Sequence, residues 1–149
     1  MTAWPDDYAR RVLQDVDSTN AEAFRRAASL AGPEWIMAYR QSAARGRGGR
    51  AWVAPAGNFS ATLLLCLNDP PAQVALRSFV AALALRDALC AVADAGSALS
   101  LKWPNDVLLS GGKVAGILLE RAGSHLAIGI GVNLIGAPSD ADAGTPASG

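Results

Sequence analysis

The sequence predicts an α+β fold in which helices pack on a mixed, largely antiparallel sheet. Two segments have the composition of helices, and several short apolar or β-branched segments have that of strands. Ser110-Gly111-Gly112 lies between two of the strand segments and is typical of a hairpin turn. Two helices on one sheet is the economical arrangement of such elements. With 149 residues, 51% of them hydrophobic, the chain is long enough for one domain with its own core.

The first half of the chain begins with a strand that leads into a helix. A weak alternation over 12–16 predicts the strand, and Ala, Glu, Phe and Arg dominate 21–30. Thr19 and Glu22 have the spacing of a capping box, so we expect the Thr19 hydroxyl to cap this helix. The helix should end near Gly32-Pro33. The next expected elements are a strand over 35–40, a loop over 41–52 and a strand over 61–67.

The second half begins with a long helix over 71–93, a segment rich in Ala, Leu and Val and nearly free of Gly and Pro. Its sparse polar residues indicate that it is largely buried. The residues after Gly136 have no apolar period and reach the end of the chain without a closing element. We therefore expect 1–149 to be one domain that is incomplete at its C-terminus, with a poorly ordered tail over 137–149. The expected strands of this half cover 99–102, 107–109, 114–120 and 126–132.

Composition narrows the class of protein. The formal net charge is zero, and no apolar run is long enough to cross a bilayer, so no membrane association is expected. The N-terminus lacks the basic and apolar regions of a secretory signal, which predicts a cytoplasmic protein. Cys66 and Cys90 lie in apolar segments without partners at metal-ligand spacing, so we expect two buried thiols and neither a disulfide nor a metal site. His125, the single histidine, is expected at the surface without a role.

The loop over 41–52 places three arginines among three glycines: Arg45, Arg47, Arg50, Gly46, Gly48 and Gly49. Glycines permit close backbone approach, and guanidinium groups bind phosphate or carboxylate oxygens in pairs, so the loop is suited to wrap an anion. A solvated flexible loop or a nucleic-acid contact is the alternative interpretation. The loop is not a Walker A motif, because no Gly-Lys-Ser/Thr follows.

Two further segments carry polar groups at expected strand ends. In the first, Lys102-Trp-Pro-Asn-Asp106 precedes the hairpin turn, and Lys113 and Gly116 follow it, so Lys113 and Asp106 should lie on neighbouring strands. Two lysines and a carboxylate suit a reaction that builds negative charge on a phosphoryl group, although an ordinary hairpin with solvated lysines has the same pattern. The second segment, Ala127 to Asn133, has alternate glycines that let a ligand approach the backbone. No helix pattern follows it, which excludes the dinucleotide fingerprint.

Together with Ser18-Thr19-Asn20, these segments resemble the catalytic domain of biotin protein ligases in order and in spacing. The resemblance covers about 17–133 and implies the fold shared with class II aminoacyl-tRNA synthetases. It also implies a two-step reaction. Biotin and ATP, with Mg²⁺ expected, form biotinyl-5′-AMP and pyrophosphate, and a lysine of a biotin carboxyl carrier domain of a carboxylase then takes the biotinyl group.

The resemblance assigns roles to individual residues. Biotin is expected to contact Ser18, Thr19, Asn20, Gln41, Arg45, Gly46, Arg47, Lys113 and Gly116. The nucleotide is expected to contact Arg47, Arg50, Trp52, Lys102, Asn105 and Asn133. The expected catalytic residues are Lys113 and Arg47, which would stabilise the charge that develops as the biotin carboxylate attacks ATP, and Asp106. For Asp106 we hypothesise that it orients or deprotonates the acceptor lysine.

Three alternatives differ in class. A lipoate or octanoate protein ligase shares the fold, but its expected Arg-Arg-x-x-Gly-Gly-Gly loop and His-Asp pair are not found in this sequence. A nucleic-acid binding module requires a wider basic face than a chain of zero net charge provides. A biotin-binding fragment without ligase turnover is the third alternative, and it differs from the enzyme in binding biotin without forming product.

The sequence departs from the family pattern at two places. Ala44 stands where the family has glycine, so the arginine loop would order poorly if that position needs a positive φ. The chain also ends at 149, before the further helices, strands and small C-terminal barrel of family members. The residues before Ser18 are too few for a helix-turn-helix domain, so DNA is not an expected partner, whereas a homodimer is possible.

Overall fold

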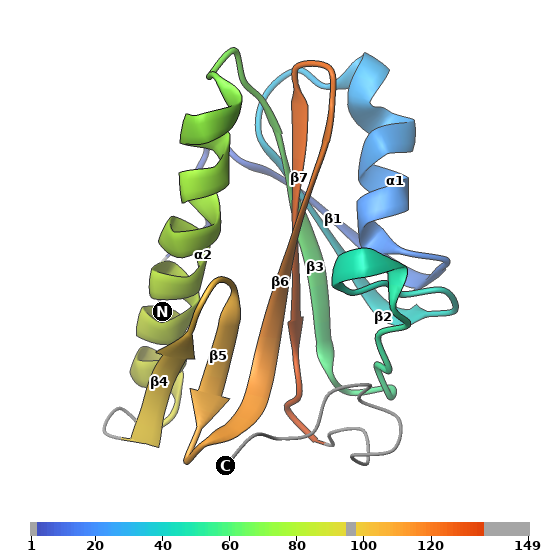
Figure 1. Cartoon of the computed structure of the whole chain (residues 1–149). Coiled ribbons are helices and arrows are strands. Elements are labelled where there is room, and N and C mark those ends of the chain that lie inside the picture. Colours follow the sequence, from blue (N-terminus) through green and yellow to red (C-terminus); the bar gives the residue numbers. More distant parts are fainter. Residues whose placement is uncertain (1–2, 95–97, 136–149) are drawn as a thin grey trace.

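The computed structural model describes residues 3–94 and 98–135, and it confirms the predicted α+β fold. In the described part of the chain, a seven-stranded sheet has the order β1-β2-β3-β7-β6-β5-β4, and all neighbours are antiparallel except β1 and β2 (Figure 1). The strands are β1 Ala9–Val16, β2 Glu34–Gln41, β3 Phe59–Cys66, β4 Leu99–Lys102, β5 Asp106–Leu109, β6 Gly112–Ala122 and β7 His125–Val132. The helices are α1 Thr19–Arg26 and α2 Pro71–Val92, with short 3-10 turns at Ala27–Ser29 and Arg47–Gly49.

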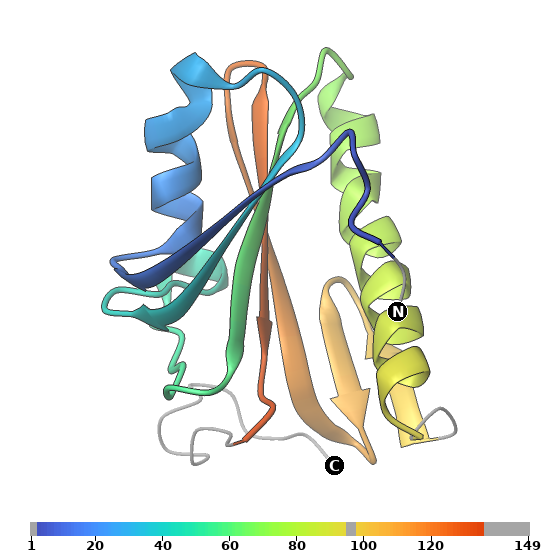
Figure 2. The same ribbon diagram turned by 180° about the vertical axis from the view of Figure 1, so that it is seen from behind.

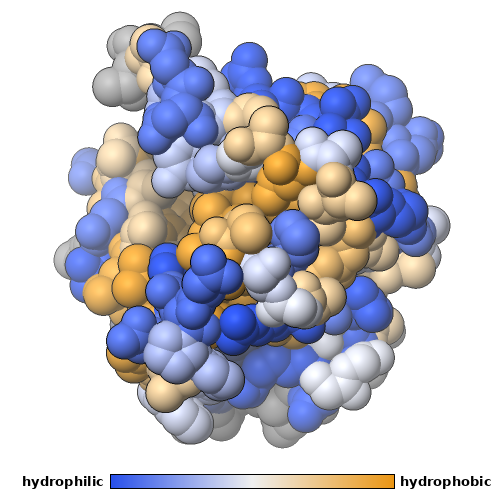
Figure 3. Space-filling view, turned by 90° about the horizontal axis from the view of Figure 1, so that it is seen from above, coloured by the Kyte–Doolittle hydropathy of each residue, from blue (hydrophilic) through white to orange (hydrophobic). Residues whose placement is uncertain are grey.

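The two helices cover opposite faces of the sheet (Figures 1 and 2). Successive strand residues point to opposite faces, so each strand of the centre contributes to two cores. Leu64 and Ala127 are buried in the cluster that includes α1, whereas their neighbours Leu126 and Ile128 are buried in the cluster that includes α2. Seen from the end of the sheet where β6 turns into β7, apolar residues gather toward the middle of the molecule and hydrophilic residues surround them (Figure 3).

The start of α1 differs from the capping-box prediction. Ser18, not Thr19, caps the helix: its backbone is extended, and its Oγ accepts a hydrogen bond from the amide of Ala21. Glu22 pairs instead with Arg25, one turn further along the helix, at 2.7 Å. Thr19 is the first helical residue, and its hydroxyl turns toward β2 and β3, where it finds other partners. The prediction was therefore wrong in the capping residue, and the helix begins one residue earlier than expected. It also ends earlier than the expected Gly32-Pro33, at Arg26, and a 3-10 turn over Ala27–Ser29 follows it.

Two burial predictions were also wrong. Helix α2 buries only Val74 and Ala82, because one side of it packs on the sheet and its other side is open among the described residues. That open side carries Leu76, Val80 and Leu83, which are exposed. Cys66 is exposed as well, because it is the last residue of β3, and Cys90 is intermediate. No described helix is long and apolar enough to span a membrane. The predicted tail over 137–149 lies outside the described residues.

Candidate functional site

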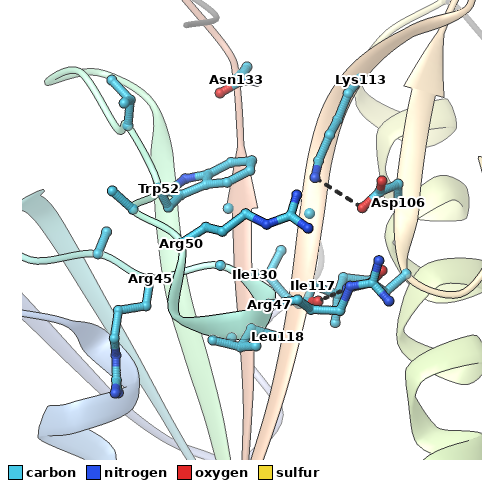
Figure 4. A pocket seen from close by; sticks show the side chains of 18 of the residues that line it. Arg45, Arg47, Arg50, Trp52, Asp106, Lys113, Ile117, Leu118, Ile130 and Asn133 are labelled. Carbon is cyan, nitrogen blue, oxygen red and sulfur yellow. Dashed lines mark hydrogen bonds and ion pairs between the residues drawn. The ribbon is translucent and has the colours of Figure 1, made fainter. Parts of the chain in front are cut away.

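A cavity of about 570 Å³ lies on the α1 face of the sheet, between α1, the arginine loop and the middle of β6 and β7. Its volume falls in the range of roughly 300–1,000 Å³ that is usual for small-molecule sites. All site residues predicted from the sequence line this cavity: Ser18, Thr19, Asn20, Gln41, Arg45, Gly46, Arg47, Arg50, Trp52, Lys102, Asn105, Asp106, Lys113, Gly116 and Asn133. Figure 4 labels seven of them: Arg45, Arg47, Arg50, Trp52, Asp106, Lys113 and Asn133.

The parallel pair of β1 and β2 brings two distant segments to this cavity. Strands β1 and β2 end at the same edge of the sheet, where the amide of Ser42 donates to the carbonyl of Val16 and the amide of Ala43 donates to that of Asp17. The residues after β1 form the start of α1, and those after β2 form the arginine loop. This pairing places Gln41 against Thr19: its Oε1 accepts from the Thr19 amide at 2.8 Å and lies 3.2 Å from the Thr19 hydroxyl.

An ion pair stiffens the same junction. Arg25 donates to both carboxylate oxygens of Asp17, at 2.6 and 2.9 Å. This guanidinium, helped by the backbone amide of Ser18, lowers the pKa of Asp17 well below its usual range. Asp17 is therefore ionised at neutral pH, and it joins α1 to the turn that leads into the helix.

The floor of the cavity is a sheet surface without side chains at two places. On β7, Gly129 and Gly131 face the cavity at successive positions, about 7 Å apart along the strand. A Cβ at Gly129 would lie 2.5 Å from Oδ1 of Asn20, and a Cβ at Gly131 would lie 2.7 Å from Nε1 of Trp52. The glycines let both side chains lie directly on the sheet. The cavity therefore has one end beside Asn20, over Gly129, and another end beside Trp52, over Gly131.

The end beside Asn20 is polar but largely uncharged. Ser18, Thr19, Asn20 and Gln41 line it, and the first three are buried. Hydroxyl and amide groups both donate and accept hydrogen bonds, so they can satisfy a neutral polar ligand without burying a charge.

The end beside Trp52 is cationic. Lys113 Nζ lies 5.2 Å from the centre of the Trp52 ring and 3.1 Å from Oδ1 of Asp106, on the neighbouring strand β5. In Figure 4 the side chains of Arg47 and Arg50 extend toward the Lys113–Asp106 pair, whereas Arg45 points away from it. The lining residues include five cations and one carboxylate, that of Asp106, in a chain of zero net charge. Such a concentration of positive charge suits a polyphosphate ligand.

Two asparagines complete this end. Asn105 is buried, and its Nδ2 donates to the carbonyl of Ile117. Its Oδ1 is buried without a hydrogen-bond partner in the described part of the chain. Asn133 is held by a hydrogen bond from its amide to the carbonyl of Val114 and by Asn58, whose Nδ2 lies 3.4 Å from the Asn133 Oδ1.

The arginine loop folds back on itself across the cavity. The amide of Trp52 donates to the carbonyl of Ala44, and the amide of Gly46 donates to that of Arg50. Gly48 and Gly49 at the tip have φ values of 69° and 74°, a conformation that favours glycine. Ala44 does not need one, because Ser110 is the only non-glycine residue with a positive φ among the described residues. The backbone strain considered for Ala44 is therefore absent from this conformation.

Some residues of or beside the cavity were given no role from the sequence. Leu118 lines it, Thr62 and Glu120 contact Asn20, and Asn58 contacts Asn133. Two of them, Thr62 and Glu120, stand out in the sequence pattern. Thr62 is the polar residue of the strand expected over 61–67, and Glu120 ends an apolar run in phase with Gly116 and Leu118.

Comparisons with known proteins identify the family of this chain. Residues 11–133 match the family model of the biotin/lipoate A/B protein ligase family. A biotin--[acetyl-CoA-carboxylase] ligase of Paracoccus denitrificans is 55% identical over 140 residues, which cover 91% of this chain and 58% of that protein. The chain spans about half the length of the curated relatives it matches.

Solved structures share the fold. Biotin protein ligase of Leishmania major, in complex with biotinyl-5-AMP, has a TM-score of 0.78 and 33% identity, and the match covers 93% of this chain and 62% of that one. The Aquifex aeolicus biotin protein ligase, in complex with biotin and ATP, has a TM-score of 0.74 and 31% identity, and the match covers 90% of this chain and 57% of that one. From the matched family model, the relatives and the shared fold, it follows that this chain belongs to the biotin/lipoate A/B protein ligase family.

Proposed function

We propose that this chain carries the biotin- and ATP-binding site of a biotin--[biotin carboxyl carrier protein] ligase. The observation that supports this most strongly is the joining of an uncharged polar end and a cationic end in one cavity of about 570 Å³. Biotin has a neutral urea ring at one end and a carboxylate at the other, and ATP adds a triphosphate. The ligands bound in the Leishmania major and Aquifex aeolicus proteins are of the same chemistry.

The uncharged end is proposed to hold the urea ring. Ser18, Thr19, Asn20 and Gln41 supply donors and acceptors there, and Leu118 and the Gly129 floor supply apolar contact. The valeryl chain of biotin would then run along the sheet toward Gly116, and its carboxylate would reach Lys113.

Activation is proposed at the cationic end. The biotin carboxylate oxygen attacks the α-phosphorus of ATP, the bond to the β-phosphate oxygen breaks, and pyrophosphate leaves with the bonding electrons. Lys113, Arg47 and Arg50 stabilise the charge on the phosphoryl oxygens, and the indole of Trp52 is a flat surface on which adenine can stack. Lys102, Asn105 and Asn133, which line the same cavity, are proposed to hold the nucleotide.

The transfer step is proposed to use Asp106. Its carboxylate pairs with Lys113, which is proposed to contact the biotin carboxylate, so Asp106 would lie close to the activated carbonyl carbon. From there it can orient or deprotonate the acceptor lysine. No group of three or more metal-ligating side chains occurs among the described residues, so Mg²⁺ would be carried mainly by the ATP phosphates. Asp106 and Asn133 are the side-chain oxygens that would meet it. We place the reaction in the cytoplasm, where ATP is available.

The test is formation of pyrophosphate and biotinyl-5′-AMP by this chain from biotin and ATP-Mg²⁺. Lys113→Ala should lower the rate by at least about a hundredfold, because one charge-stabilising group in a reacting site contributes on that order. Arg86→Ala is the matched control: it removes a cation that is paired with Asp87 on the open side of α2, far from the cavity. Its rate should remain within about twofold of the wild-type rate.

Three results have different meanings. Pyrophosphate release that requires biotin and Lys113 supports the adenylation step, and subsequent labelling of a carrier domain supports the transfer step. Biotin binding without pyrophosphate leaves a biotin-binding fragment. Release with lipoate or octanoate but not with biotin would replace the proposed substrate.

A further inference from the structure

One buried amide in the cavity has a fixed orientation. Asn20 Nδ2 donates to Oε2 of Glu120 at 2.8 Å and lies 3.4 Å from the carbonyl of Leu118. If the two ends of the Asn20 amide were exchanged, its oxygen would face these two acceptors, which is unfavourable. The carboxylate of Glu120 therefore holds the nitrogen of Asn20 toward β6 and its oxygen toward β3.

The orientation of the Asn20 amide determines how the Thr62 hydroxyl is hydrogen-bonded. This residue is fully buried on β3, and it pairs across the sheet with Gly129, over which Asn20 lies. The Thr62 hydroxyl is 2.6 Å from Oδ1 of Asn20 and 2.8 Å from the hydroxyl of Thr19. Because it has a single proton and Asn20 Oδ1 can only accept, Thr62 donates to Asn20. Its contact with Thr19 is then one in which Thr62 accepts.

The hydrogen-bond directions set at Thr62 also fix Thr19 and Gln41, which line the cavity. Thr19 directs its proton to Thr62 at 2.8 Å and not to Oε1 of Gln41, which lies 3.2 Å from the Thr19 hydroxyl and accepts from the Thr19 amide at 2.8 Å. Gln41 then offers its amide nitrogen to the cavity as a donor, and Thr19 offers an oxygen lone pair as an acceptor. A urea needs this combination, since its carbonyl accepts and its ring N–H groups donate.

Glu120 also contacts the arginine loop. Arg45 Nη2 lies 3.3 Å from the same Oε2 that accepts from Asn20. A single carboxylate oxygen therefore joins the loop over the cavity to the buried amide on its floor.

We propose that Glu120 and Thr62 are positioning residues that set the donor and acceptor pattern of the biotin pocket and make it selective for a neutral urea. Neither residue lines the cavity. They act through Asn20, Thr19 and Arg45. The inference rests on the proposed function, because it concerns how the same pocket recognises biotin.

The experiment measures binding of biotin and of 2-iminobiotin to the full 149-residue chain by calorimetry. In 2-iminobiotin a donor replaces the urea carbonyl, so its affinity relative to biotin reports the pattern. Thr62→Val keeps the shape of the side chain and removes the hydroxyl, and Thr62→Ser restores the hydroxyl. Glu120→Gln keeps the size and weakens the preference for one amide orientation, because the new amide can donate or accept. Asp69→Asn is the matched control, because Asp69 also pairs with an arginine, Arg77, at similar exposure and away from the cavity.

Thr62→Val and Glu120→Gln should each weaken biotin binding by about tenfold, in line with the loss of one buried hydrogen bond. Both should lower the preference for biotin over 2-iminobiotin, whereas Thr62→Ser and Asp69→Asn should keep both values within about twofold. A general loss of fold would weaken both ligands equally and leave their ratio unchanged. If Thr62→Val does not fold, Glu120→Gln alone provides the ratio.

The outcomes separate the two proposals. A wild-type chain that binds biotin, with unchanged affinities and an unchanged ratio in both variants, overturns the positioning roles and leaves the proposed function standing. A wild-type chain that does not bind biotin overturns both.

Discussion

The glycine floor makes a sharp prediction for Gly129→Ala. The new Cβ would lie 2.5 Å from Oδ1 and 3.0 Å from Cγ of Asn20, so the side chain must retreat by roughly 1 Å to reach van der Waals distance. Its hydrogen bonds to Thr62 and Glu120, now 2.6 and 2.8 Å, would then exceed hydrogen-bonding distance. Two such bonds contribute about 1 kcal/mol each, and the restricted unfolded backbone offsets about 0.5–1 kcal/mol.

The expected net loss of folding free energy is therefore about 1–1.5 kcal/mol, a fall in Tm of about 2–6 °C for a chain of this length. Biotin affinity should fall by more than about tenfold, because the pocket loses its fixed amide. Thermal unfolding and calorimetry measure the two effects. Gly32→Ala is the control, since its Cβ would meet nothing within 4 Å and no positive φ is involved. A Gly129→Ala variant with the Tm and biotin affinity of the wild type would refute the reasoning.

Three further predictions test other parts of the structure. Gly131→Ala, whose Cβ would lie 2.7 Å from the Trp52 indole, should raise the KM for ATP by about tenfold in the adenylation assay, with the biotin Kd changed by less than about threefold. Glu34→Ala should lower Tm by about 6–12 °C in a thermal scan, because it leaves two arginines without their buried carboxylate at a cost of about 3 kcal/mol; a Tm within 2 °C of the wild type would contradict this. Asp17→Asn tests the ion pair with Arg25: since the folded pKa of Asp17 is lowered, its stabilisation is complete above the unfolded pKa of about 3.9 and is lost as the pH falls further. Urea unfolding at several pH values should show a variant whose deficit at pH 7 shrinks below about pH 4, and a deficit that is constant down to pH 2 would exclude the ion pair as its cause.

Much of the fold was predictable because local signals agreed with the final structure. The strand and helix positions follow from residue types and periods, and the turn at Ser110 to Gly112 follows from its glycines. The parallel pairing of β1 with β2 was not predicted, since it depends on contacts between segments about 25 residues apart. The exposure of α2 was missed for a similar reason: an apolar helix has the same composition whether one side or all of it is covered.

The candidate site was predictable as a set of residues but not as a network. Motif spacing brought out Thr19, Asn20 and Gln41, yet whether Ser18 or Thr19 caps α1 is decided by Gln41, 22 residues from Thr19. Thr62 and Glu120 meet at Asn20 only because of the sheet register, which places β3 and β6 on either side of β7. Sequence spacing contains no information on that register.

The bare backbone under the cavity has a consequence for redesign. A side chain at position 129 or 131 would displace Asn20 or Trp52 from the floor, so a changed ligand is better accommodated at the walls of the cavity. The wall residues Ser18 and Gln41 and the arginine loop are the positions at which a library can admit a biotin analogue. A search for an enzyme that attaches a modified tag should therefore keep both glycines constant, and it should vary the wall opposite the new substituent.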